Sequence, residues 1–359
     1  MDSSAPDGRL PMMTSGNSSA QLRDLRALPK THLHLHFSGS MRLSTLKDLA
    51  QERGVRLPEA LLDGEALRVP ATQRGWFRFQ RLYDAARACV RDADDMARLI
   101  NEAVADDAAE GSKRLEIQVD PTSYAPLVGG LTPALEIIMD AAARAGEEHG
   151  IEVGVIVATS RLKHPMDART LARLAAMNAG DANGEVIGFG LSNDERRGDT
   201  PEFARAFRIA RRAGLASVPH GGELLGPDHV REVLDTLAPD RLGHGVRAFE
   251  DQDLLEEIIQ RGIALEVCPA SNVSLGVYPE LSYVPVPELL RAGATIALGA
   301  DDPLLFNERL LDQYENARHV YGLDDPQIAE LARGSIRASR ASDSSKRQWL
   351  KEIDDWLGS

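Results

Sequence analysis

The hexapeptide Thr-His-Leu-His-Leu-His at residues 31–36 sets the frame for interpreting the rest of this chain. Side chains of an extended strand alternate between its two faces, so His34 and His36 share one face and the leucines share the other. Two imidazoles on one face, followed by the glycine-bearing turn at residues 37–40, form half of a metal site. Paired histidines also occur without a metal, so the interpretation depends on the residues at later strand ends.

The composition is that of a soluble globular protein. The 359 residues are 43% hydrophobic and 27% charged, and no apolar run reaches the roughly 20 residues of a membrane span. We interpret residues 1–24 as a disordered tail rather than a signal peptide, and residues 25–359 as a single domain. Two cysteines, Cys89 and Cys268, exclude a disulfide framework and a cysteine-rich zinc site, and they predict a cytoplasmic location.

The charge balance restricts the partners. A net charge of −14 repels nucleic acid at long range, and the chain lacks the Cys-x-x-Cys pair of deaminases that act on flipped bases. We therefore expect a small-molecule partner, with no nucleic acid and no membrane. The sequence carries no signal for an oligomeric state.

Short apolar runs alternate with amphipathic segments along the chain, which predicts a parallel sheet closed as a (β/α)₈ TIM-type barrel. Helical periodicity is clear at residues 132–148 and 201–213, and residues 42–113 predict a helical insertion after the first strand. The predicted strands are Thr31–His36, Arg114–Val119, Glu152–Ala158, Val186–Leu191, Ala216–His220, Arg241–Gly245, Ile263–Val267 and Thr295–Gly299.

Polar residues stand at the carboxyl ends of these strands, where such barrels carry their chemistry. His220 ends strand five, with Glu223 close behind, His244 lies at the end of strand six, and Asp301 and Asp302 follow strand eight. Imidazoles with one carboxylate suit zinc or a similar first-row cation. A water in the open coordination position becomes a hydroxide nucleophile near neutral pH.

These residue types also suggest roles in proton transfer. Glu223 is placed to move protons, His244 to orient the attacking water, and Asp302 to bind substrate. Each residue has a structural alternative: the histidines as buried residues bonded to carbonyls, Glu223 as the opening of a helix, and residues 301–303 as a helix cap. The predicted metal site would be absent only if all of these structural alternatives were correct at the same time. Residues 186–191 contain no lysine to bridge two metals, which favours one metal ion.

Six motifs in this order resemble the adenosine deaminase family, within the wider amidohydrolase barrels, from Leu28 to Trp356. They are Leu-Pro-Lys-Thr-His-Leu-His-Leu-His-Phe-Ser-Gly-Ser (28–40), Gly-Phe-Gly-Leu-Ser-Asn-Asp-Glu (188–195), His-Gly-Gly-Glu (220–223), Arg-Leu-Gly-His-Gly (241–245), Cys-Pro-Ala-Ser-Asn (268–272) and Asp-Asp-Pro (301–303).

The resemblance implies zinc-dependent deamination of adenosine and 2′-deoxyadenosine to inosine and 2′-deoxyinosine, with release of ammonia, in purine salvage. It implies that Glu223 protonates purine N1, that His244 aligns the hydroxide attacking C6, and that Asp302 contacts N7. It also implies one Zn²⁺ per chain, held by His34, His36, His220 and Asp301. The substrate-binding residues expected from it are His36, Ser38, Phe79, Tyr83, Asn193 and Asp302.

The chain departs from the family pattern at three positions. Ser38 stands where adenosine-specific members carry the Asp that meets the ribose 5′ hydroxyl, Asn193 stands where Gly is frequent, and Gln118 where Arg is common. The sequence therefore does not determine which group the substrate carries in place of the ribose. The alternative substrates are adenine, an N6-substituted or phosphorylated nucleoside, and aminodeoxyfutalosine. Arg42 could meet an anionic 5′ group or be a solvated helix residue.

The sequence leaves open the role of one helix face and two rival functions. Phe79 and Tyr83 share one helix face and form either a lid over the nucleoside, as the resemblance suggests, or ordinary packing against the barrel. A metal-dependent ester or lactone hydrolase on the same barrel is a rival function. A non-catalytic binding protein that kept the fold is another.

Overall fold

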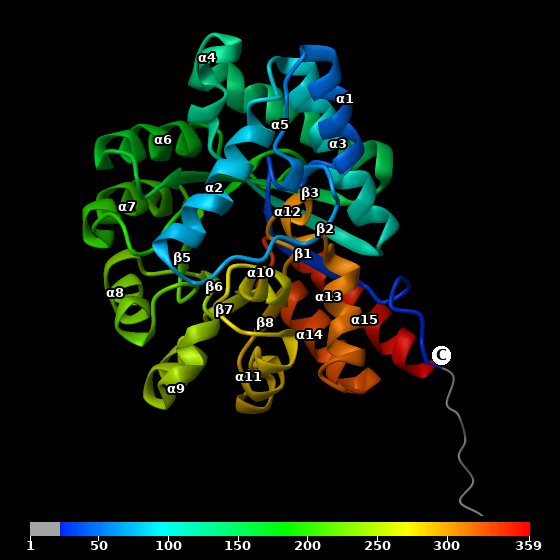
Figure 1. The fold of residues 1–359 in the computed structure, drawn as a ribbon. Helices are drawn as coiled ribbons and strands as arrows, with labels where there is room; N and C mark the ends of the chain where they lie inside the picture. Colours follow the sequence, from blue (N-terminus) through cyan, green and yellow to red (C-terminus); the bar gives the residue numbers. More distant parts are fainter. Residues whose placement is uncertain (1–21) are drawn as a thin grey trace, which may run out of the picture.

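The computed structural model describes residues 22–359, which form a barrel of eight parallel strands in chain order (Figure 1). Backbone hydrogen bonds from His36 to Asp301 and from Asp301 to His34 join the first strand to the segment after the last. All eight predicted strands are confirmed within two residues. Their bounds are β1 Lys30–His36, β2 Ser112–Val119, β3 Glu152–Ser160, β4 Val186–Ser192, β5 Ala216–Gly221, β6 Arg241–His244, β7 Ala264–Val267 and β8 Ile296–Leu298.

Helices surround the strands on the outside (Figure 1). The segment predicted at residues 132–148 is α5, Leu131–His149. The single helix predicted at residues 201–213 was wrong at its start: a 3₁₀ turn, η3 (Thr200–Phe203), precedes α7 (Ala204–Arg212). Pro201 occupies the first turn, where its fixed φ is tolerated but its missing N–H donor cannot extend the helix backwards.

The predicted insertion consists of α1 (Leu43–Arg53), η1 (Glu59–Leu61), α2 (Gln73–Arg87) and α3 (Ala93–Ala109). α3 packs against α5 and β2, so it serves as the barrel's own first helix. α2 crosses the end of the barrel in Figure 1, and its residues line the central cavity together with residues from the strand ends. The insertion therefore contributes directly to the walls of that cavity.

The C-terminal part covers the barrel beside its first strand, because α14 (Asp325–Ala338) packs against both β1 and β8. The remaining helices are η2 Pro121–Ser123, α4 Ala125–Val128, α6 Pro165–Met177, α8 Pro227–Leu237, η4 Val246–Glu250, α9 Gln252–Gln260, α10 Pro269–Ser274, η5 Leu281–Tyr283, α11 Val286–Ala292, α12 Pro303–Phe306, α13 Leu310–His319 and α15 Asp343–Gly358. Within residues 22–359, none of the helices has the length and apolar character needed to cross a membrane.

Residues 1–21 of the predicted tail lie outside the described residues. Just after them, Arg23 donates hydrogen bonds to the carbonyls of Trp356 and Leu357 and pairs with Asp325 at 2.9 Å. Trp356 in turn donates its indole N–H to the carbonyl of Asp24. These contacts attach the beginning of the described chain to its last helix.

Candidate active site

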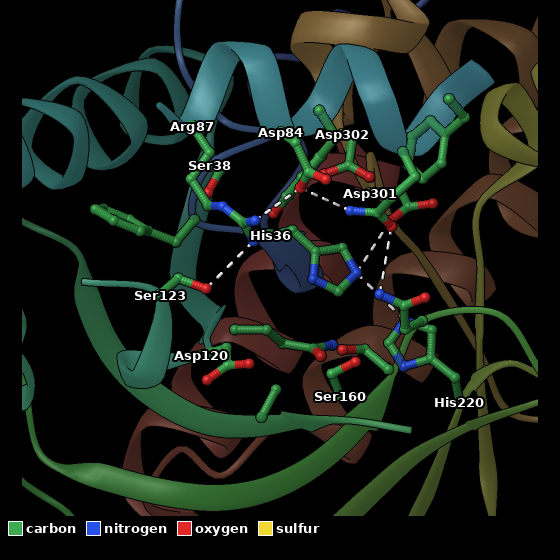
Figure 2. Close-up of a pocket in the computed structure, with 18 of the residues that line it drawn as sticks. His36, Ser38, Asp84, Arg87, Asp120, Ser123, Ser160, His220, Asp301 and Asp302 are labelled. Carbon is green, nitrogen blue, oxygen red and sulfur yellow. Dashed lines mark hydrogen bonds and ion pairs between the residues drawn. The ribbon is translucent and has the colours of Figure 1, made fainter. Parts of the chain in front are cut away.

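Donor atoms from the ends of three strands, β1, β5 and β8, meet at one point in the barrel mouth. His36 Nε2 lies 3.2 Å from His220 Nε2 and 3.2 Å from Asp301 Oδ1, and His34 Nε2 lies 3.6 Å from the same carboxylate oxygen. Figure 2 shows His36, His220 and Asp301 turned toward one another. The separate segments that carry them are brought together by the closure of the barrel.

This donor set fits a first-row divalent cation. With zinc–nitrogen bonds of 2.0–2.1 Å, adjacent donors of a tetrahedral site lie about 3.3 Å apart, close to the separations observed. The buried Nε2 atom of His34 has no hydrogen-bond partner among residues 22–359. Burial and then the neighbouring histidines lower the pKa of His220 well below its usual value, which favours the neutral form that binds metal.

Two residues of the site, Asp301 and His244, have a strained backbone conformation. Asp301 has φ 61° and His244 has φ 63°, a left-handed conformation that non-glycine residues seldom adopt. Such strain persists only where the surrounding structure enforces it, and it concentrates at functional sites. For Asp301, its hydrogen bonds with the backbone of His34 and His36 on β1 provide that enforcement.

His34 is oriented from below by a buried chain of charges. Its Nδ1 lies 2.8 Å from Glu266 Oε2, and Glu266 Oε1 accepts a hydrogen bond of 2.6 Å from Arg241, which lies 2.7 Å from Glu116. Burial alone would lower the pKa of His34, but the nearby carboxylates of Asp301 and Glu266 outweigh it and raise the pKa to about 10. With its Nδ1 proton held by Glu266, His34 presents Nε2 to the cavity.

Replacing Glu266 with Gln is expected to weaken metal binding by about 10- to 100-fold, because the neutral amide holds the His34 ring less firmly. Release of bound metal to a chelator measures this effect, and thermal unfolding checks that the variant is folded. Glu256→Gln, an exposed position on α9, is the matched control. Unchanged metal release in a folded Glu266→Gln protein would contradict the role given to this carboxylate.

Proton-transfer groups stand beside the donor cluster. His244 Nε2 lies 3.8 Å from Glu223 Oε1 and 3.9 Å from Asp301 Oδ2, and all three side chains are buried. Burial, followed by the charges of Glu195 and Asp301, raises the pKa of Glu223 well above its usual value, which favours a protonated acid. Burial lowers the pKa of His244 to about 3, so its imidazole is neutral and can accept a proton.

Asp302 points into the same cavity, and its buried Oδ1 has no hydrogen-bond partner in the part of the chain that the structure describes. A Cβ atom on Gly39 would lie 1.7 Å from this oxygen, so only glycine fits there. Burial and the charge of Asp301 raise the pKa of Asp302 well above its usual value. A carboxyl group in this state can donate a hydrogen bond to an acceptor on a ligand.

The cavity has a volume of about 330 Å³, and its lining includes a buried group and a more exposed group of residues, which we call its inner and outer parts. Its inner part holds the donor cluster and the acids. Its outer part is polar: Arg87 pairs with Asp84 at 2.7 Å and donates to Ser123 at 3.2 Å (Figure 2), and Lys163 pairs with Asp120 at 2.7 Å. Sequence reasoning missed these residues. The placement of residues 120 and 163 just after β2 and β3 was the available signal, because loops after barrel strands line such sites.

The other predicted substrate residues also reach the cavity. Ser38 is hydrogen-bonded to the Tyr124 hydroxyl, and Asn193, at φ 81°, donates to Gln80 at 3.3 Å. Phe79 stacks on Phe306, with ring centroids 5.7 Å apart. The cavity is lined by Ser38, Phe79, Tyr83, Gln118 and Asn193. Phe79 thus both packs against a neighbouring helix and lines the cavity.

Arg42 does not line this cavity. Its guanidinium pairs with Asp106 on α3 at 2.6 Å, and its side chain is 39% exposed. The hypothesis that Arg42 meets an anionic 5′ group is therefore wrong, because the side chain is engaged on the outer face between α1 and α3. Gln118 instead lies beneath the donor cluster, with Nε2 3.4 Å from His34 Nδ1.

A barrel with imidazole and carboxylate donors at its strand ends, beside a buried carboxyl group whose pKa is raised, defines a hydrolase of the amidohydrolase type. The family model for adenosine deaminase matches residues 29–356. The chain therefore belongs to the adenosine deaminase family, which is metal-dependent and hydrolyses C–N bonds. This confirms the predicted family, fold and enzyme class.

Individual relatives agree with this assignment. A Streptomyces virginiae protein named "Putative adenosine/adenine deaminase" is 58% identical over 336 residues, covering 93% of this chain and 98% of that protein. The solved adenine deaminase of Arthrobacter aurescens is 30% identical, with a TM-score of 0.84, over 92% of this chain and 100% of that one. A Burkholderia ambifaria amidohydrolase with bound Zn shares the fold at 24% identity, a TM-score of 0.81 and 93% coverage of each chain.

Proposed function

We propose that this protein is a zinc-dependent aminohydrolase that converts adenosine and 2′-deoxyadenosine to the corresponding inosines and ammonia, in purine salvage. One Zn²⁺ per chain would be held by His34, His36, His220 and Asp301. The observation that carries the proposal is the convergence of these donors beside a Glu223 whose pKa is raised and a His244 whose pKa is lowered.

In this proposal the chain's own residues divide the proton transfers between them. The metal, when bound, lowers the pKa of a water molecule so that hydroxide is available at neutral pH. Neutral His244 accepts a hydrogen bond from the attacking water and orients it toward purine C6. Glu223 donates its proton to N1, which makes C6 more electrophilic, and Asp302 donates to N7. The oxygen of the attacking water adds to C6 as one of its protons passes to His244 and then replaces the proton that Glu223 gave up. The second proton moves from the C6 hydroxyl to N6, so the C6–N6 bond breaks, ammonia leaves and a C6 carbonyl forms.

A nucleoside is favoured over a free base by the shape of the cavity. A purine ring bound to the acids would fill the inner part only. The polar outer part, with Asp84, Arg87, Asp120 and Lys163, would then meet nothing of the substrate. Hydroxyl groups of a ribose match these donors and acceptors without adding charge.

Adenine is the second candidate, and one contact favours it. The Ser38 hydroxyl is already paired with Tyr124, which leaves it less available to a ribose 5′ hydroxyl. The solved relative with 30% identity is also named an adenine deaminase.

The test follows loss of absorbance in the adenosine band, with zinc-loaded protein and adenosine, 2′-deoxyadenosine or adenine supplied separately. We expect fast loss with the two nucleosides. Turnover of adenine alone would replace the proposed substrate with the free base. If none of the three is turned over while one zinc is bound, deamination at C6 would remain the proposed reaction. The substrates to test next would then be N6-substituted or phosphorylated nucleosides and aminodeoxyfutalosine.

The partner and the location belong to the same proposal. We propose a small purine nucleoside as the partner and the cytoplasm as the site of the reaction. Two free, buried cysteines, Cys89 and Cys268, are compatible with a reducing compartment.

A further inference from the structure

Glu195 ends the motif at residues 188–195, and the reaction described above leaves it without a role. It follows β4 in the loop at the barrel mouth and is only 3% exposed. A buried carboxylate is costly unless its oxygens are hydrogen-bonded, so its partners explain its presence.

Those partners are three consecutive backbone N–H groups of the loop after β5. Glu195 Oε1 accepts from Glu223 at 3.1 Å, and Oε2 accepts from Leu224 at 2.8 Å and from Leu225 at 2.9 Å. Hydrogen bonds to a charged acceptor are about twice as strong as neutral ones. The carboxylate therefore holds the turn that carries Glu223.

A carboxylate suits this position better than an amide. Two acceptor oxygens are needed to satisfy three converging donors, whereas a Gln side chain offers one oxygen and turns an NH₂ group toward N–H donors. The hydrogen bonds that reach Glu223 in the described part of the chain go to its backbone nitrogen rather than to its carboxyl group. The position of that carboxyl group in the cavity thus depends on the backbone of its turn.

The same loop has other hydrogen bonds, including one at 2.6 Å from the Arg247 guanidinium to the carbonyl of Leu224. Gly222 accepts a backbone hydrogen bond from Arg247 at 3.0 Å, and Gly221 accepts one from Gly245 at 3.0 Å. Gly222 has φ 79°, which allows the chain to turn sharply before Glu223. The anchors before Glu223 therefore set the path of the turn, while Glu195 fixes Glu223 and the two residues that follow it.

We propose that Glu195 is a positioning residue for proton transfer, which acts by holding the backbone of Glu223 so that its carboxyl group faces N1 of the bound purine. Glu195 touches neither substrate nor metal in this proposal. Its negative charge has a second effect in the same direction: after burial, it contributes most to raising the pKa of Glu223. The proposal rests on the proposed function, because it assigns Glu195 to the acid of that reaction.

The test is a double-mutant cycle on full-length, zinc-loaded protein. Glu195→Gln is expected to lower kcat by about 10- to 100-fold, as for a catalytic group displaced by about 1 Å, while KM and zinc content change less than about twofold. In a Glu223→Gln background, the second substitution should have almost no further effect. Glu202→Gln, an exposed glutamate in the following η3, is the matched control and should leave kcat unchanged.

The outcomes distinguish a failure of the positioning role of Glu195 from a failure of the proposed function. Full activity in Glu195→Gln, with a slow Glu223→Gln enzyme, would overturn the positioning role and leave the proposed function intact. Equal losses of kcat in both backgrounds would show that Glu195 acts through something other than Glu223 and would also overturn it. Full activity in Glu223→Gln would instead remove the proposed acid itself. Thermal unfolding and zinc content confirm that each variant is folded and loaded.

Discussion

Glu223→Gln is expected to lower turnover by at least about 10²-fold, because the reaction loses the acid that protonates N1. The substitution keeps the size of the side chain and replaces none of the four proposed metal ligands, so zinc content should stay at one per chain. The wild-type kcat should fall as pH rises through the raised pKa of Glu223, since the carboxyl group then loses its proton. That loss of kcat at high pH should be missing from the variant.

Steady-state rates with adenosine, together with metal analysis, measure both effects. Glu147→Gln on α5 replaces an exposed glutamate and serves as the control. Near-normal turnover in Glu223→Gln would remove this residue from the mechanism. Loss of zinc would show instead that Glu223 belongs to the metal site.

His220→Ala is expected to abolish both metal binding and turnover. His220 Nε2 lies 3.2 Å from His36 Nε2, and removing one of four proposed donors leaves an incomplete coordination shell in a buried cavity. Metal analysis after exposure to a mild chelator should find one zinc per wild-type chain and almost none in the variant.

His319 on α13 provides the matched control, because its side chain is 60% exposed and, among residues 22–359, it pairs with Glu315 on the same helix. His319→Ala should keep its zinc and its activity. Full zinc occupancy in His220→Ala would contradict the proposed ligand set. Two metal ions per wild-type chain would favour the rival two-metal hydrolase of esters or lactones.

The recurring polar residues at strand ends were predictable because two local rules apply to them. Alternation along β1 places His34 and His36 on one face, and in parallel barrels every strand ends at the same rim. The order of apolar runs therefore predicted the barrel, and the residues after each run predicted the donor cluster. The assignment of His34 and His36 to one face of β1 required no knowledge of which strands are neighbours.

Contacts between loops that are distant in the sequence could not be predicted from strand periodicity and residue type. Nothing in the sequence near Glu195 indicates that its carboxylate meets the backbone of residues 223–225, since this contact depends on how the loops after β4 and β5 are packed. The pairing of Arg42 with Asp106 and the entry of α2 into the cavity wall depend likewise on the placement of the insertion.

The sequence by itself determined the barrel and the chemistry at its rim, because strand periodicity and residue type are local properties that survive closure of the sheet. Only the tertiary structure decided which charges support His34, how Glu223 is held, and which polar groups face the outer part of the cavity. Those features arise from pairs such as His34 with Glu266, whose members are far apart in the chain and meet in the folded core, where a buried charge is costly unless it is paired.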